Sequence, residues 1–246
     1  MTTTVDEHTT PSAARAASSV SPAPPAGRAL LVLDGVSKQW RKQDPPLLEE
    51  LDLELPSGTL ALIVGRNGVG KTTLLRIIAG IITADRGAVW LDGLSPTSNR
   101  REYLRRVGLV SAGSTGLYAR VSVAQHLDYW ACVALVPDVE RGPRVAAALA
   151  RFELEEIAPR RTDRLSMGQR QRVRLALAFL HDPSLLVFDE PWNSLDGKGV
   201  ALLNDAVREF AEGGGSGLFC VPTGHDLGVL PADRVYTLEG GKLERS

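Results

Sequence analysis

The nine residues G-R-N-G-V-G-K-T-T, at positions 65–73, constrain the fold of this chain more than any other stretch. They follow the apolar run L-A-L-I-V and lead into the helix-like run L-L-R-I-I-A. A G-x-x-x-x-G-K-[ST] spacing between a strand and a helix is typical of a phosphate-binding loop, whose backbone N–H groups turn toward phosphate oxygens. The residues expected to contact the phosphates are Gly65, Arg66, Asn67, Gly68, Val69, Gly70, Lys71, Thr72 and Thr73.

A second apolar run, S-L-L-V-F-D-E-P at positions 184–191, ends in two acids. With a phosphate loop upstream, Asp189 is expected to bind magnesium beside the Thr72 hydroxyl, and Glu190 is expected to polarise an attacking water. Lys71 would neutralise charge that grows on the phosphate oxygens during the reaction. The two stretches together predict a phosphoryl-transfer enzyme.

The order of the apolar runs predicts an α/β chain with a parallel-sheet core and an inserted helical subdomain. In residues 47–56, Leu51, Leu53 and Leu55 alternate with acids, as in a half-exposed strand. Residues from about 103 to 180 have mostly helical patterns, and strands alternate with a helix after them. We expect one nucleotide-binding domain over residues 29–246.

The composition narrows the compartment and the partners. The net charge of −1 gives no general attraction to nucleic acid or to an anionic membrane. No apolar run reaches the roughly 20 residues of a membrane span. The only cysteines, Cys132 and Cys220, are far apart and are expected to be small buried residues in a reducing compartment. Residues 1–28, rich in Thr, Ser, Ala and Pro, are expected to be a disordered tail rather than a signal peptide.

The stretch R-L-S-M-G-Q-R-Q-R, at positions 164–172, also opens a helix and so offers a second anion site. Together with the phosphate loop and the D-E pair, it resembles the ATP-binding subunits of ABC transporters from residue 29 onward. L-S-M-G-Q is similar to that family's signature L-S-G-G-Q, with Met167 in place of glycine. The resemblance implies a head-to-tail dimer in which Ser166, Gly168 and Gln169 contact ATP held by a second chain. A serine N-cap on a core helix fits the same residues.

The resemblance implies roles at three further positions. Trp40 stands where an aromatic residue stacks on adenine, although plain packing fits it as well. Asp196, in S-L-D, matches the loop that links the two sites of the dimer. His225 matches the histidine that senses the γ-phosphate and positions the water, which makes it a catalytic candidate with Lys71 and Glu190. Gly224 replaces the usual threonine before it.

One position departs from the family in a way that bears on catalysis. Where the family has a glutamine that binds magnesium and water, this chain has Ala112, or Ser111 or Ser114 if the alignment shifts. The site would then hydrolyse slowly, use water at the missing ligand position, or pair with a different chain whose site is complete.

The resemblance implies a fold with a P-loop NTPase (RecA-like) core, an antiparallel β portion and the helical subdomain. It also implies a Mg²⁺- and ATP-dependent ATPase that pairs with a second nucleotide-binding domain and powers a separate membrane permease from the cytoplasmic face. The permease is expected to contact residues 113–130, with Tyr118 and Tyr129 as anchors or, for Tyr129, as core packing. A weaker similarity to ABC-2-type and haem-exporter ATPases favours export. The alternatives are a soluble ABC-type ATPase acting on nucleic acid or the ribosome, and a nucleotide-binding regulator with little hydrolysis.

Overall fold

The computed structural model describes residues 29–111, 116–224 and 231–246. Its strands are β1 (Ala29–Lys38), β2 (Leu48–Pro56), β3 (Leu60–Gly65), β4 (Arg86–Leu91), β5 (Val107–Val110), β6 (Leu185–Asp189), β7 (Ser216–Pro222), β8 (Arg234–Glu239) and β9 (Lys242–Arg245). Its α-helices are α1 (Lys71–Ile78), α2 (Arg100–Arg105), α3 (Val123–Val133), α4 (Asp138–Arg151), α5 (Met167–Phe179) and α6 (Gly197–Glu212). The tail proposed for residues 1–28 lies outside the described residues.

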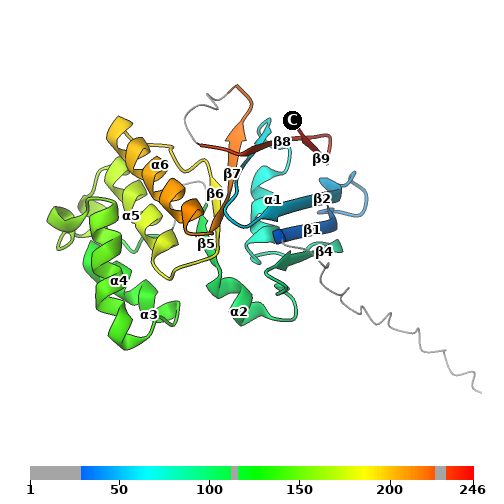
Figure 1. Cartoon of the computed structure of the whole chain (residues 1–246). Coiled ribbons are helices and arrows are strands. Elements are labelled where there is room, and N and C mark those ends of the chain that lie inside the picture. Colours follow the sequence, from blue (N-terminus) through cyan, green and yellow to red (C-terminus); the bar gives the residue numbers. More distant parts are fainter. Residues whose placement is uncertain (1–28, 112–115, 225–230) are drawn as a thin grey trace, which may run out of the picture.

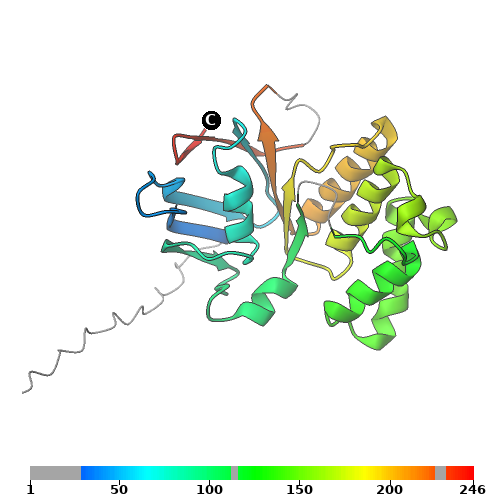
Figure 2. The ribbon, with the colours of Figure 1, turned by 180° about the vertical axis from the view of Figure 1, so that it is seen from behind.

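Two sheets organise these elements. Strands β2, β1 and β4 form an antiparallel sheet, and a second sheet has the order β5-β6-β7-β3-β8-β9. In the second sheet every pair is parallel except the terminal hairpin of β8 and β9. Helices α3 to α6 lie on one side of this sheet, and α1 with the antiparallel sheet lies on the other, as Figures 1 and 2 show from opposite directions. The predicted α/β core and antiparallel β portion are confirmed.

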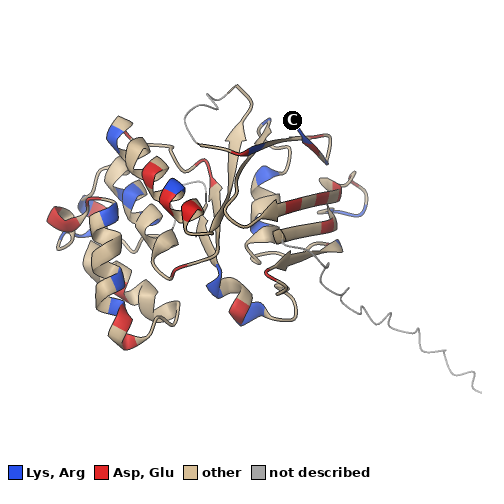
Figure 3. Cartoon of the chain, viewed as in Figure 1, with Lys and Arg blue, Asp and Glu red and all other residues tan. Residues whose placement is uncertain are grey.

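The hydrophobic patterns explain these layers. In β2 the leucines at 51, 53 and 55 are buried while Asp52 and Glu54 are exposed, so the predicted half-exposed strand is confirmed. Strand β3 is buried along nearly its whole length, as expected of a strand covered on both faces. Strand β7 carries no charged residue, in contrast to the charged outer surfaces of α4 and α6 (Figure 3).

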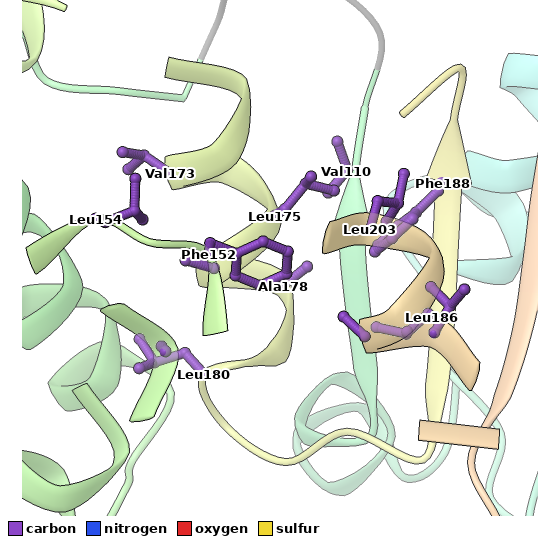
Figure 4. Packing of buried hydrophobic residues seen from close by; sticks show 14 of the residues in the cluster. Val110, Phe152, Leu154, Val173, Leu175, Ala178, Leu180, Leu186, Phe188 and Leu203 are labelled. Carbon is purple, nitrogen blue, oxygen red and sulfur yellow. The ribbon is translucent and has the colours of Figure 1, made fainter. Parts of the chain in front are cut away.

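Strand β6 divides its side chains between two cores. Leu185 and Val187 pack in the cluster that contains α1 and the antiparallel sheet. Leu186 and Phe188 pack in the other cluster, together with α5 and α6, and Figure 4 shows both of them facing that helical side. Because successive side chains of a strand point to opposite faces, one short strand serves both cores.

The helical region differs from the sequence expectation at its edges. The range 103–180 includes β5, which pairs with β6 in the sheet, so the continuous helical block begins at α3. Helix α4 starts at Asp138, within the polar stretch P-D-V-E-R-G. The acids Asp138 and Glu140 in its first turn favour the helix dipole and pair with Arg141 and Arg144, which supports a helix there despite Pro143.

Candidate functional site

The loop between β3 and α1 forms an uncapped helix start. Gly68 and Gly70 have positive φ angles of 83° and 113°, a region that glycine adopts without strain. A Cβ at Gly70 would lie 2.8 Å from Leu48 Cδ2, so the loop also needs glycine for space. Gly70 is the N-cap of α1 and gives no side-chain hydrogen bond to its first turn. The first N–H groups of α1 therefore have no capping side chain and favour an anion.

The charged and hydroxyl groups expected at this loop do converge. Lys71 is 6% exposed, and its Nζ donates to the carbonyl oxygens of Gly65 and Arg66 at 2.6 and 3.1 Å. The Thr72 hydroxyl donates to Asp189 Oδ2 at 2.6 Å, although 117 residues separate them. A pocket of about 320 Å³ collects these groups. Its lining is Leu47, Asn67, Gly68, Gly70, Lys71, Thr72, Thr73, Asp189 and Glu190.

Glu190 follows β6 in an unusual backbone conformation, with φ of 50°. Its N–H donates to the Cys220 carbonyl on β7 at 3.1 Å, and its Oε2 accepts from Asn193 Nδ2 at 2.6 Å. A non-glycine residue at positive φ is strained by roughly 1–3 kcal/mol and persists where surrounding contacts fix it. Asn193 was not singled out in the sequence, where its only signal is its position three residues after Glu190.

The oxygen donors present fit a magnesium ion that is shared with a phosphate chain. Mg²⁺ prefers one or two carboxylates together with waters and substrate phosphates. Thr72 and Asp189 already lie within hydrogen-bonding distance of one another at the helix start. Over the described ranges, no cluster of three or more His, Cys, Asp or Glu side chains offers a protein-only metal site. Thr72 and Asp189 thus supply the hydroxyl and carboxylate oxygens that such a shared ion would need.

The two cysteines differ from one another. Burial, followed by the Asp189 carboxylate, raises the pKa of the Cys220 thiol well above its ordinary value, which keeps it protonated beside the pocket. Cys132 is exposed, so the prediction that it is buried was wrong. The buried face of α3 is formed by Val123, His126, Leu127 and Ala131, and Cys132 follows just outside it.

The second predicted anion site starts α5. Ser166 is the N-cap: its Oγ accepts from the Gln169 N–H at 3.2 Å, and Gln169 Oε1 accepts from the Ser166 N–H at 3.0 Å. This reciprocal pair is a capping box. Met167 is 68% exposed at the first helical position. Ser166, Gly168 and Gln169 are absent from the lining of the phosphate-loop pocket, so these described residues form a separate surface.

Two further candidates, Asp196 and Trp40, also lie outside the lining of the phosphate-loop pocket. Asp196 caps α6 by accepting from the Gly199 N–H at 2.8 Å. Trp40 is 58% exposed, and Lys38 Nζ lies 5.2 Å from the centre of its ring. Neither residue lines the phosphate-loop pocket. His225, Ala112 and Ser114 lie outside the described residues, and Ser111 is exposed.

An apolar groove of about 600 Å³ lies beside α5 and β5. Leu104, Leu109 and Leu177 contribute to its apolar lining, and Arg101 and Arg105 add positive charge. Trp130 belongs to the same lining, and it also packs edge-on against Tyr129, which in turn packs edge-on against Tyr118. Tyr118 and Tyr129 are about half exposed. The surface expected to receive a partner is thus aromatic and borders this groove.

His126 supports this aromatic group through a hydrogen bond with Trp130. It is fully buried, and its Nε2 accepts from Trp130 Nε1 at 2.9 Å. Burial lowers the pKa of His126, while a backbone hydrogen bond with Gly116 acts in the opposite direction. A neutral imidazole with an unprotonated Nε2 is required to accept from the indole.

Comparisons with known proteins place these features in one family. The family described as "ABC transporter" matches residues 48–193. The sn-glycerol-3-phosphate import ATP-binding protein of Rhizobium johnstonii is 33% identical over 211 residues, which are 86% of this chain and 56% of that protein. The spermidine/putrescine import ATP-binding protein of Vibrio cholerae is 31% identical over 89% of this chain and 57% of its own length. The chain spans little more than half the length of these two relatives.

Solved structures agree with the fold. The structure of an ATP-binding subunit of an ABC transporter superposes with a TM-score of 0.80 and 25% identity, covering 88% of this chain and 89% of that one. A dimeric ATP-binding cassette bound to ADP and Pi gives a TM-score of 0.75 at 24% identity, covering 87% and 97%, and shows the fold alone. Because both curated relatives above are named as import proteins, the comparisons do not support the expectation of export.

Proposed function

The chain belongs to the ABC transporter family, and on that basis we propose that it is an ATP-binding and ATP-hydrolysing subunit, with residues 29–246 as its nucleotide-binding domain. The observation that carries the proposal is the convergence of Lys71, Thr72, Asp189 and Glu190 on one pocket beside an uncapped helix start. These groups come from two segments more than a hundred residues apart, and each matches a need of phosphoryl transfer.

Each residue has a definite task in this proposal. Lys71 exchanges the carbonyls of Gly65 and Arg66 for phosphate oxygens, so that its ammonium offsets their charge. Thr72 and Asp189 hold magnesium, which when bound neutralises charge on the phosphates. Glu190 accepts a proton from the attacking water, with Asn193 holding its carboxylate. His225 assists the positioning of that water.

The nucleotide would also contact residues outside the pocket lining. We assign adenine stacking to Trp40, whose ring is 58% exposed. We assign Ser166, Gly168, Gln169 and Asp196 to a second nucleotide-binding domain, identical or different, that binds head to tail. The exposed, self-capped start of α5 supports this assignment because it is a complete helix N-terminus that faces no group of its own pocket.

The partner in the membrane is proposed to be a separate permease that seats on the apolar groove and the neighbouring aromatic residues. Across the described ranges no helix is long and apolar enough to cross a bilayer, so a transport function would need such a partner. The groove supplies apolar area next to Tyr118 and Tyr129, which are the kind of anchors that protein interfaces use. The protein would then lie at the cytoplasmic face of the membrane.

Phosphate release from purified protein with Mg-ATP tests the catalytic proposal. We expect turnover in wild type and its loss in Glu190→Gln, because an amide cannot accept the proton. Glu156→Gln, a change of the same chemistry at an exposed glutamate, is the matched control and should keep wild-type turnover. Equal rates in the two variants would refute the role of Glu190. A gain in Ala112→Gln would show that a missing ligand limits the rate.

Cell fractionation tests the permease surface. Leu104 and Val139 are both exposed apolar residues, but only Leu104 lines the groove. Leu104→Glu should move the protein from the membrane fraction to the soluble fraction, since a buried charge opposes docking. Val139→Glu should leave the distribution unchanged. If both variants stay with the membranes, the groove is not the docking site.

A further inference from the structure

Gln171, in the second turn of α5, is a buried polar side chain that none of the roles above uses. It is 6% exposed. Its Nε2 donates to the Pro191 carbonyl at 2.7 Å, and its Oε1 accepts from Arg174 Nη1 at 3.1 Å. With both ends of the amide engaged, its orientation is determined by its neighbours rather than by solvent. The bond to Pro191 therefore fixes one particular backbone group.

That backbone group adjoins the proposed catalytic residue. Pro191 follows Glu190, whose φ is 50°. On the other side of Glu190, its own N–H donates to the Cys220 carbonyl of β7 at 3.1 Å. The backbone around Glu190 is thus fastened to the sheet by one hydrogen bond and to α5 by the other. Proline has no N–H, so its carbonyl is the hydrogen-bonding group by which the Pro191 backbone can be fastened.

Helix α5 touches the same loop a second time, near its first turn. A Cβ at Gly168 would lie 2.9 Å from the Ser194 carbonyl oxygen, so only a glycine allows this approach without a shift. Ser194 itself has φ of 70°. Gly168 and Gln171 are three residues apart and lie on one face of the helix. Their two contacts hold the loop from Glu190 to Ser194 along the start of α5.

We propose that Gln171 is a positioning residue that sets the direction of the Glu190 carboxylate through Pro191. The inference rests on the proposed function. It adds that the start of α5, assigned above to a nucleotide held by a second chain, is mechanically tied to the Glu190 of its own pocket. A displacement of α5 moves the Pro191 carbonyl and turns the Glu190 backbone, so each chain's signature surface adjusts that chain's own water-activating group.

The first test is hydrogen exchange by mass spectrometry on nucleotide-free full-length protein. Gln171→Met keeps the side-chain length and removes both hydrogen bonds. We expect amides of the segment 190–195 to exchange roughly five- to tenfold faster, the factor for one buried hydrogen bond. Arg172→Met is the matched control, because it removes bonds from the same helix to the carbonyls of Phe152 and Glu153 and should leave 190–195 unchanged.

The second test separates turnover from binding. Gln171→Met should lower kcat for Mg-ATP about ten- to a hundredfold, as small misplacements of catalytic groups do, while KM changes less than about twofold. Combined with Glu190→Gln, it should cause no further loss of rate, because its effect passes through Glu190. Gln171→Glu keeps an acceptor for Arg174 but has no donor for Pro191, and should reproduce both effects if Gln171→Met does not fold.

Three results would overturn the inference: wild-type exchange across 190–195 in Gln171→Met, equal acceleration there in Arg172→Met, or a rise in KM with kcat unchanged. The exchange measurement needs no hydrolysis. A wild-type protein that releases no phosphate counts against the proposed function, while the exchange rates still decide whether Gln171 holds this loop.

Discussion

The starts of helices α1 and α5 are both assigned to nucleotide phosphates, but their backbone donors are satisfied differently. Helix α1 begins after Gly70, with no side-chain cap, and its Lys71 turns back to carbonyls of its own loop. Helix α5 begins at Ser166 with a complete capping box. The first start depends on a ligand to satisfy it, whereas the second is satisfied within the free chain. In the proposed function, the start of α5 is therefore formed before a second chain binds, and the start of α1 gains its missing partners from the nucleotide.

Helix α3 provides an internal reference for this comparison. Its N-cap Ser122 forms the same box with Gln125, with distances of 3.3 and 3.2 Å. The boxes of α3 and α5 therefore share the same reciprocal pair of hydrogen bonds, and Ser122 Oγ also donates to Gln125 Oε1 at 3.0 Å. Only the box of α5 is assigned to a nucleotide. Comparing variants of the two boxes therefore distinguishes an effect on the stability of the protein from an effect on ATP hydrolysis.

The largest effect is expected at α1. Lys71→Ala removes the ammonium from the phosphate loop and should lower phosphate release at least about a hundredfold, since the developing charge loses its nearest cation. It should also reduce the rise in melting temperature on adding Mg-ATP. Lys198→Ala, at an exposed lysine on α6 paired with Glu153, is the control and should behave as wild type. Normal turnover in Lys71→Ala would refute the assignment of the start of α1 to the phosphates of the nucleotide.

The next effect tests whether α5 meets a second chain. Glu190→Gln should accumulate an ATP-dependent dimer, because nucleotide binds but is not hydrolysed. Light scattering with and without Mg-ATP would show a doubling of mass for a pair of identical chains. A Glu190→Gln protein that stays monomeric at all ATP concentrations would contradict pairing with an identical chain, and a different partner chain should then restore the shift.

A smaller effect compares the two capping boxes directly. Ser166→Ala and Ser122→Ala should each lower the free energy of unfolding by about 1 kcal/mol, the usual cost of losing an N-cap. Urea titration without nucleotide measures both losses. Only Ser166→Ala should also lower phosphate release, because only that hydroxyl is proposed to meet ATP. Equal rates for the two variants would reduce the α5 box to a structural cap.

The smallest effect concerns acid. Burial lowers the pKa of both His126 and His181 from the ordinary value of 6.5. The unfolded chain then binds more protons than the folded one as pH falls below about 6.5, so the stability contributed by the neutral rings is complete above that pH and declines below it. His126 lies in the buried face of α3, so this helix should lose exchange protection in acid before α1 does.

Urea titrations at pH 7.5 and 5.5 provide the measurement. Wild type should be less stable at the lower pH, and His126→Gln should show a smaller difference because a glutamine can still accept from Trp130 without titrating. A free energy of unfolding that does not change between the two pH values would exclude the effect.

The sequence predicted the parts of the site that depend on local chemistry. The phosphate loop, the buried strand before Asp189 and the alternation of leucines in β2 were all readable, because each depends on periodicity or on glycine at a tight turn. The Ser166 cap was readable because serine is a preferred N-cap before a helix. The 2.6 Å contact of Thr72 with Asp189 followed from expecting both at one metal.

Contacts made through the backbone of distant segments were not predicted. The bond from Gln171 to Pro191 and the contact of Gly168 with Ser194 depend on how α5 crosses a loop, which no local pattern encodes. The positive φ of Glu190 is not favoured by glutamate itself and occurs where the backbone is bonded to Cys220 on one side and to Gln171 on the other. The exposure of Cys132 and the place of β5 in the sheet likewise depend on packing between elements.

The alternation of side chains along β6 determines which of the two acids at its end is directed toward Thr72. Leu185, Val187 and Asp189 lie on the same face of β6. That face is directed toward α1, where the Thr72 hydroxyl donates to the Asp189 carboxylate. Inserting one residue between positions 185 and 188 would move every later side chain of the strand to the opposite face. Glu190 rather than Asp189 would then be directed toward Thr72. Inserting two would restore the faces but move both acids two residues, about 6.6 Å, too far along the strand. Two requirements therefore fix the length of this strand. The leucine, valine and phenylalanine side chains must face their own cores, and the two acids must lie at the right distance from Thr72.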